Sequence, residues 1–226
     1  MKKLEKNVKH LDRLVKRLDS IVKQLDSILL FKPHNMLISG VTNCGKTYFV
    51  LDLIEKYYFK KFNYIIIFCP TLFYNTTYER RWIFNDKNVV IIPPESVEED
   101  LDSILKFTTQ VYNGSHTLFI IDDCANLHDT KKKISELCNL AYSARHYGIT
   151  TWVLTQKYNS IVKDFRENIR MLVLFYNKDE NAMKQALEEN AIIPKEIRRE
   201  IIEKLKNDKG SKLILRLETP YDYILV

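Results

Sequence analysis

After Pro33, two patterns of apolar and polar residues alternate along the chain. Short runs of consecutive apolar residues predict buried β-strands, and stretches with helical periodicity lie between them. The predicted strands are residues 36–39, 64–68, 89–92, 117–122, 150–155 and 171–176. The predicted helices are residues 46–60, 97–112, 131–146, 180–190 and 195–207. Strands that are apolar throughout and separated by helices indicate an α/β fold with a mainly parallel sheet covered on both faces.

Two details refine this pattern at the element ends. Ser96 and Glu99 have the spacing of a capping box, which predicts the start of the helix at 97–112. The last apolar segments, 212–217 and 221–226, flank a turn at Thr219-Pro220. That arrangement predicts a C-terminal antiparallel hairpin on the edge of the sheet.

A heptad repeat occupies residues 1–32. Its apolar seam consists of Leu4, Val8, Leu11, Val15, Leu18, Val22 and Leu25. This spacing predicts an amphipathic or coiled-coil helix that ends before Pro33, followed by a second unit over residues 34–226. The helix either docks on its own domain, or associates with other copies of the chain, or lies as a basic helix on a membrane or DNA.

The composition sets the class of protein. The chain has 226 residues, a net charge of +6 and 46% hydrophobic residues, so it has the composition of a globular protein. Residues 1–32 hold nine Lys and Arg against four Asp and Glu, which is +5 of that charge. A basic arm on a nearly neutral body permits contact with nucleic acid but does not require it. The apolar runs are too short to span a membrane, and no signal peptide precedes them, so we expect an intracellular protein.

The four cysteines lie in or beside apolar segments and are expected to be free thiols. A zinc site built from Cys124, His128, Cys138 and His146 is an alternative, but the sequence lacks the paired CxxC spacing of such sites.

Residues 40–47 match the phosphate-binding pattern GxxxxGK[ST] in full, between a predicted strand and a predicted helix. The expected nucleotide-binding residues are Gly40, Val41, Thr42, Asn43, Cys44, Gly45, Lys46 and Thr47. The loop's N–H groups and the helix N-terminus would face the phosphates of ATP. Lys46 would contact the β- and γ-phosphates, and the Thr47 hydroxyl would be a ligand of Mg²⁺.

A second acidic motif follows at 117–124, where an apolar strand ends in two carboxylates. Asp122 is the expected partner of Mg²⁺, and Asp123 is the expected general base that polarises the attacking water. This is the form of a Walker B strand.

Polar residues also flank the strand at 150–155. Gln156 follows it directly and is placed to sense the γ-phosphate, unless it is simply solvated. Arg145 and His146 precede the strand at a predicted helix end, where an arginine is also favoured by the helix dipole alone.

Together these motifs resemble the genome-packaging ATPases of large DNA viruses, virophages and related DNA transposons, within the FtsK–HerA superfamily. The motifs that carry the resemblance are GVTNCGKT, IIFCPT, LFIIDD and ARHYGITTWVLTQKYNSI, over roughly residues 34–176. The Asp-Asp ending of the acidic strand departs from the Asp-Glu of many relatives, which leaves the base assignment open.

The resemblance implies a RecA-like αβα P-loop NTPase that works as a homo-oligomeric ring and pumps double-stranded DNA into a capsid. It implies that Gln156 is the sensor and Arg145 the arginine finger, with Arg166 and Arg170 as rival fingers. Capsid proteins are further implied partners, no membrane is expected, and the expected location is the host cytoplasm, a viral factory or the virion. Lys131, Lys132 and Lys133 form either a DNA-facing patch or a solvated helix start.

Other functions fit the same motifs. A DNA pump for segregation or transfer would share the fold and the site. A small-molecule P-loop kinase would need an Arg-rich lid, for which Arg198 and Arg199 are the only suggestion. A nucleotide switch that does not hydrolyse would not need the full set of site residues.

Overall fold

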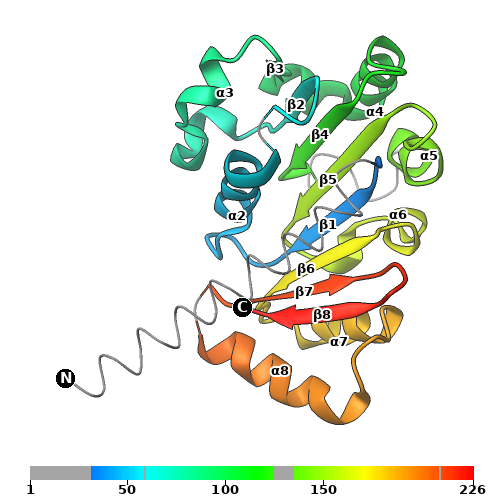
Figure 1. Ribbon diagram of the computed structural model, residues 1–226. Coiled ribbons are helices and arrows are strands. Elements are labelled where there is room, and N and C mark those ends of the chain that lie inside the picture. The colour runs from blue at the N-terminus through cyan, green and yellow to red at the C-terminus, as the bar shows by residue number, and fades with distance from the viewer. Residues whose placement is uncertain (1–31, 59, 125–134, 209) are drawn as a thin grey trace.

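One eight-stranded sheet organises the described chain (Figure 1). The computed structural model describes residues 32–58, 60–124, 135–208 and 210–226. The strands are β1 Asn35–Ser39, β2 Tyr64–Phe68, β3 Val89–Ile91, β4 Thr117–Asp122, β5 Ile149–Thr155, β6 Met171–Phe175, β7 Lys212–Arg216 and β8 Asp222–Leu225. Their order across the sheet is β3-β2-β4-β5-β1-β6-β7-β8. The pairs from β3 to β6 are parallel, and β7 and β8 are antiparallel.

Helices cover both faces of this sheet. They are α2 Lys46–Leu53, α3 Arg81–Asn85, α4 Pro94–Val111, α5 Ser135–Ser143, α6 Lys163–Glu167, α7 Glu180–Glu189 and α8 Lys195–Asn207. A π-helical turn at Ile54–Tyr58 extends α2, and short 3₁₀ turns occupy Leu72–Tyr74, Thr76–Tyr78 and Tyr158–Ser160. In Figure 1, α2 and α3 lie on one side of the sheet, and α4, α5 and α6 lie on the other.

Two apolar cores explain why the central strands are apolar at every position. Met36 and Ile38 of β1 pack with the core under α2 and α3, while Leu37 between them packs with the core under α4 to α8. Successive side chains of a strand point to opposite faces, so a strand covered on both faces needs apolar residues throughout. The predicted mainly parallel sheet with a C-terminal hairpin is confirmed, and the hairpin's β8 forms an edge of the sheet.

The capping prediction for the helix after β3 is wrong. This helix, α4, begins at Pro94 rather than at 97, so Ser96 lies inside its first turn. Proline suits the first turn of a helix because the backbone N–H groups of that turn have no acceptor within the helix. The N–H that proline lacks therefore costs no hydrogen bond. The helical path breaks at Asp100, whose side chain accepts a hydrogen bond from the backbone N–H of Ser103 at 3.1 Å. Asp100 therefore caps the longer second part of α4.

Several predictions concern residues outside the described part of the chain. The heptad repeat falls almost entirely in residues 1–31, and Lys131 to Lys133 and His128 fall in residues 125–134. Within the described residues, no helix combines the length and apolar character that a membrane span requires.

Asn35 joins three elements beneath the start of β1. Its side-chain amide donates to the carbonyl of Ala141 in α5 at 3.1 Å and to the carbonyl of Asn168, which follows α6, at 3.4 Å. The residue is 6% exposed. A buried polar group is tolerated when it is hydrogen-bonded, so this amide fixes α5 and α6 against the central strand.

We expect Asn35→Ala to destabilise the protein by about 1–3 kcal/mol, because two carbonyls lose a buried donor. Urea unfolding followed by circular dichroism would measure the change. The matched control is Asn113→Ala, at an exposed position that should alter stability by less than about 0.5 kcal/mol. Equal losses in the two variants would contradict the role given to Asn35.

Candidate nucleotide and metal site

The P-loop leaves the sheet at the carboxyl end of β1 and turns directly into α2. The backbone N–H of Gly40 donates to the carbonyl of Thr155 at 3.1 Å, which anchors the loop to β5. The Lys46 ammonium donates to the carbonyls of Gly40 at 2.8 Å and Val41 at 3.1 Å. The lysine thus lies against its own loop, where its charge would meet bound phosphate oxygens.

A physical constraint explains why each of the two loop positions 40 and 45 is a glycine. A Cβ atom on Gly40 would lie 2.5 Å from Cβ of Phe175 and 2.7 Å from the Cys44 sulfur, so a side chain does not fit there. Gly45 has a φ of 102°, in the left-handed region that glycine occupies without strain. The motif therefore reflects close packing at its first glycine and backbone conformation at its second.

The predicted magnesium residues lie together. The Thr47 hydroxyl donates to Oδ2 of Asp122 at 2.8 Å, and the Tyr78 hydroxyl donates to the same oxygen at 2.8 Å. Burial raises the pKa of the Asp122 carboxyl, while the hydrogen bonds from Tyr78 and Thr47 act in the opposite direction. A hydroxyl and a carboxylate are oxygen ligands of the kind that Mg²⁺ prefers, so these residues fit the ion.

Asp123 and Gln156, predicted as base and sensor, are in contact. The Gln156 side-chain amide donates to Oδ1 of Asp123 at 3.0 Å. Asp123 has a φ of 58°, which is unusual outside glycine, and it directly follows the end of β4 at Asp122. The backbone of Gln156 is held in turn, because the Asn177 amide donates to its carbonyl at 2.8 Å.

One cavity of about 480 Å³ is lined by Lys46, Thr47, Asp122, Asp123 and Gln156 together. Its lining consists of Thr42, Asn43, Gly45, Lys46, Thr47, Tyr48, Thr71, Tyr74, Asn75, Thr76, Thr77, Asp122, Asp123 and Gln156. The segment from Thr71 to Thr77 follows β2, and sequence reasoning gave it no role in the site. Tyr78 was also missed, since nothing in its neighbourhood in the sequence marks it as a partner of Asp122.

The three arginines proposed as fingers differ in their surroundings. Arg145 lies in the turn after α5, which ends at Ser143 rather than at the predicted 146, and its side chain is exposed. It forms no ion pair or side-chain hydrogen bond with another described residue. Arg166 is 8% exposed, is paired with Glu189 and lies over the Tyr158 ring, 4.9 Å from its centroid. Arg170 is paired with Glu218 at 3.3 Å.

The alternative zinc site gains no support from the described residues. Cys124 and Cys138 are buried free thiols, and no cluster of metal-binding side chains is found in the part of the chain that the structure describes. The Cys124 thiol instead donates to the carbonyls of Phe68 at 3.5 Å and Asp122 at 3.3 Å.

Comparison with known proteins places this site in context. The profile of the poxvirus A32 protein family matches residues 23–217. The fold is similar to B204, the DNA-packaging ATPase from Sulfolobus turreted icosahedral virus, with a TM-score of 0.63 and 17% identity over 86% of this chain and 97% of that chain. None of the curated protein sequences gave a significant match.

Two further structures are similar and were solved with nucleotide analogues. The genome packaging NTPase B204 from Sulfolobus turreted icosahedral virus 2, in complex with AMPPCP, has a TM-score of 0.59 and 19% identity over 85% of this chain and 96% of that chain. The pCW3 conjugation coupling protein TcpA, with ATPγS, has a TM-score of 0.60 and 17% identity over 87% of this chain and 60% of that chain. The matches confirm the P-loop NTPase fold and the resemblance to viral genome-packaging ATPases that the motifs indicated.

We expect Tyr78→Phe to raise the Mg²⁺ concentration needed for half-maximal nucleotide turnover by on the order of tenfold, because Asp122 loses one of its two orienting donors. The phenyl ring keeps the packing, so the free energy of unfolding should change by only about 1 kcal/mol. A magnesium titration at saturating nucleotide would measure the effect. Tyr142→Phe, on the exposed face of α5, is the control, and an identical magnesium dependence in both variants would refute the role of Tyr78.

Proposed function

Because the chain belongs to the poxvirus A32 protein family, we propose that it is a Mg²⁺-dependent ATPase that drives double-stranded DNA into a viral capsid. The observation that carries the proposal is the meeting of five side chains at one edge of the sheet. They are Lys46, Thr47, Asp122, Asp123 and Gln156, which line a single cavity. The related fold of B204, described as a DNA-packaging ATPase, supports the assignment. The proposed location of the protein is the host cytoplasm or a viral factory.

The chain's own residues have distinct tasks in hydrolysis. The backbone N–H groups of the P-loop and the Lys46 ammonium bind the phosphate oxygens and neutralise their charge. Thr47 and Asp122 would hold Mg²⁺, which supplies further positive charge beside the β- and γ-phosphates when bound. Asp123 accepts the proton of the attacking water. Gln156 is hydrogen-bonded to Asp123 and orients that water toward the γ-phosphate.

The position of Arg145 supports a role between subunits. Arg145 precedes β5, whereas Gln156 follows it, so the whole strand Ile149–Thr155 separates the arginine from its own nucleotide site. Seven extended residues span on the order of 20 Å, which is beyond the reach of an arginine side chain. We propose that Arg145 completes the site of the next copy in a homo-oligomeric ring. Arg166 and Arg170 are already paired within their own chain.

Two of the three rival functions, the kinase and the other DNA pump, receive less support than packaging. A small-molecule kinase would use arginines above the phosphates, but Arg198 donates to the carbonyl of Ile193 and neither Arg198 nor Arg199 lines the cavity. A DNA pump for segregation or transfer would have the same fold, as the similarity to a conjugation coupling protein illustrates. Family membership favours packaging, with capsid proteins as the further partners.

We expect wild-type protein to hydrolyse ATP with Mg²⁺ and to do so faster with double-stranded DNA. Asp123→Asn should retain ATP while hydrolysis slows by on the order of 10²–10⁴-fold, because only the base is lost. Asparagine also tolerates the left-handed backbone of position 123, so the loop should keep its shape. Lys46→Ala should lose both ATP binding and turnover. Phosphate release and equilibrium binding would measure these effects.

Hydrolysis by Asp123→Asn at the wild-type rate would refute the base assignment. Stimulation by a nucleoside or sugar in place of DNA would refute the proposed pump and favour the kinase.

We expect Arg145→Ala to bind ATP normally and to lose DNA-stimulated hydrolysis by on the order of 10³-fold, because an arginine supplied in trans stabilises charge on the γ-phosphate. Mixing this variant with Lys46→Ala should restore part of the activity, since an interface formed between the two variants can combine an intact P-loop with an intact finger. Lys157→Ala, another exposed cation, is the control and should retain activity. Full turnover by Arg145→Ala alone would show that this residue is not the finger.

A further inference from the structure

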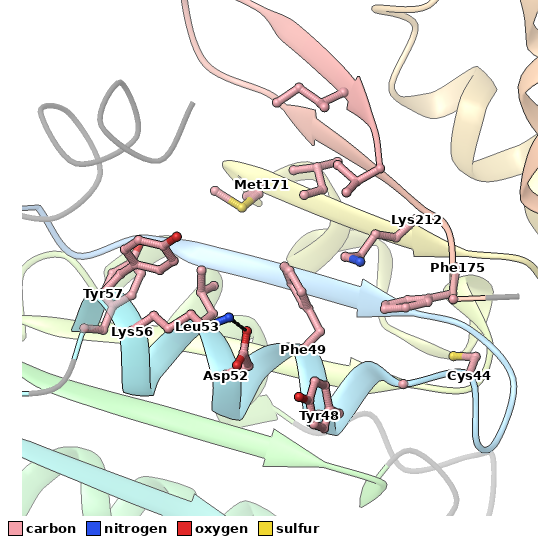
Figure 2. A pocket seen from close by; sticks show the side chains of 16 residues that line it. Cys44, Tyr48, Phe49, Asp52, Leu53, Lys56, Tyr57, Met171, Phe175 and Lys212 are labelled. Carbon is pink, nitrogen blue, oxygen red and sulfur yellow. Dashed lines mark ion pairs between the residues drawn. The ribbon is translucent and has the colours of Figure 1, made fainter. Parts of the chain in front are cut away.

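A side-chain hydrogen bond joins the ends of two strands that do not pair with each other. Asn177 lies two residues after the end of β6, and its amide donates to the carbonyl of Gln156, the residue after β5, at 2.8 Å. In the sheet, β1 lies between β5 and β6. Figure 2 shows Phe175, the last residue of β6, near Cys44 of the P-loop. The hydrogen bond from Asn177 therefore spans the strand end at which the P-loop begins.

Asn177 uses both halves of its amide. Its Oδ1 accepts a hydrogen bond from the backbone N–H of Asp179 at 3.0 Å, and the residue is only 7% exposed. Because Oδ1 faces an N–H donor, the NH₂ group is the half that faces the Gln156 carbonyl. The Asp179 side chain in turn accepts from the backbone N–H groups of Asn181 and Ala182, both at 3.1 Å, and so caps the start of α7. One side chain thus ties the main chain of Gln156 to the start of α7.

The turn after β5, residues 156–160, is also attached to the other end of α7. The Tyr158 hydroxyl donates to Oε2 of Glu189 at 2.8 Å, and the Asn190 amide donates to the Tyr158 hydroxyl at 2.9 Å. Burial, together with the hydrogen bond to Glu189, raises the pKa of Tyr158 to about 12, so the hydroxyl keeps its proton and remains a donor. A helix of this length measures about 15 Å, and both of its ends contact the same turn.

This helix is a firm support. Its inner face consists of Ala182, Met183, Ala186 and Leu187, which are all buried. Closely packed interiors resist displacement, so the position of α7 relative to the sheet is well defined. Gln156 itself lies beyond the end of β5 at Thr155, and its side-chain amide must stay 3.0 Å from Oδ1 of Asp123. The contacts with α7 therefore hold a residue that strand pairing does not hold.

We propose that Asn177 is a positioning residue for hydrolysis, which holds the main chain of Gln156 so that its side chain meets Asp123 and the attacking water. The inference rests on the proposed ATPase function and adds to it a residue outside the nucleotide cavity. Asn177 is not among the residues that line that cavity, so its effect passes through Gln156. If the Gln156 carbonyl moves, its side chain moves with it, and a misplacement of about 1 Å can cost on the order of 100-fold in rate.

Asn177→Asp is the sharpest test. The aspartate keeps the size of the side chain and an acceptor for the Asp179 N–H, but it places an oxygen without a hydrogen against the Gln156 carbonyl. We expect kcat for ATP, with Mg²⁺ and saturating double-stranded DNA, to fall by on the order of tenfold. KM and the Kd for ATP should stay within about twofold of wild type, because the residues that bind the phosphates are unchanged. Asn177→Ala, which removes both hydrogen bonds, should show the same split.

Asn181→Asp is the matched control. It makes the same amide-to-acid change four residues further along, at an exposed position in the first turn of α7. A negative charge is favourable at the start of a helix, so the variant should keep both the stability and the kcat of wild type. Circular dichroism at the assay temperature would show that each variant is folded.

A double-mutant cycle with Gln156→Ala separates positioning from a general structural role. Gln156→Ala removes the side chain that Asn177 is proposed to position. In that background Asn177→Asp should lower kcat by less than about twofold, because two residues that act through one contact are not additive. A structural role independent of Gln156 would instead lower kcat by the same factor in both backgrounds.

The outcomes separate the inference from the function on which it rests. A lower kcat at unchanged KM that disappears in the Gln156→Ala background supports the role of Asn177. Unchanged kcat in both Asn177 variants, a change in KM alone, equal factors in both backgrounds, full activity of Gln156→Ala or loss of folding in both Asn177 variants would overturn it and leave the ATPase standing. Failure of wild-type protein to hydrolyse ATP would overturn the proposed function itself, and the positioning role with it.

Discussion

Parallel pairing of β4, β5 and β1 determines which residues of this protein can meet. In the observed register Asp122 lies beside Leu154, and Leu154 lies beside Ile38. One position further on, Thr155 pairs with Ser39, and the backbone N–H of Gly40 donates to the carbonyl of Thr155. Asp123 and Gln156 directly follow β4 and β5 at the same end of the sheet. Carboxyl ends of parallel strands gather at one edge, so phosphate loop, acidic strand end and sensor are placed together by backbone pairing rather than by side-chain contacts. A shift by one residue would turn every side chain to the other face.

A buried carboxylate is the costly element of this arrangement. Asp122 is 4% exposed, and burial of an unpaired charge is strongly unfavourable. Thr47 and Tyr78 offset part of that cost by donating to one of its oxygens. These residues come from the start of α2 and from the segment after β2. The Asp122 carboxylate is thus held by two segments that are far apart in the sequence. The same two contacts that stabilise Asp122 also orient it for a cation.

The elements around the site divide its tasks. The segment after β2 lines the nucleotide cavity between Thr71 and Thr77 and contacts Asp122 through Tyr78, whereas α2, β6 and the C-terminal hairpin line a neighbouring cavity of about 410 Å³. Arg166 is held by Glu189, where burial raises the pKa of the glutamate but hydrogen bonds from Gln185 and Tyr158 and the Arg166 charge lower it on balance. This arginine stabilises the junction of α6 and α7. Of the three proposed fingers, Arg145 is the one whose side chain is exposed and has no ion pair with another described residue.

Local patterns along the chain were enough to predict the strands, their alternation with helices and the P-loop, and they also predicted that Lys46, Thr47 and Asp122 lie close together. Such signals are local, because apolar runs and the spacing of Gly40, Gly45 and Lys46 depend on backbone geometry within a few residues. Folding alone decided that Tyr78 would reach Asp122, that Gln156 would contact Asp123 and that Asn35 would join α5 and α6. Those contacts link residues 44, 33 and 106 positions apart, and no local pattern encodes such pairings. The start of α4 was also misjudged, because Pro94 and Asp100 competed with Ser96 as helix-start signals and only the packed helix shows which of them prevailed.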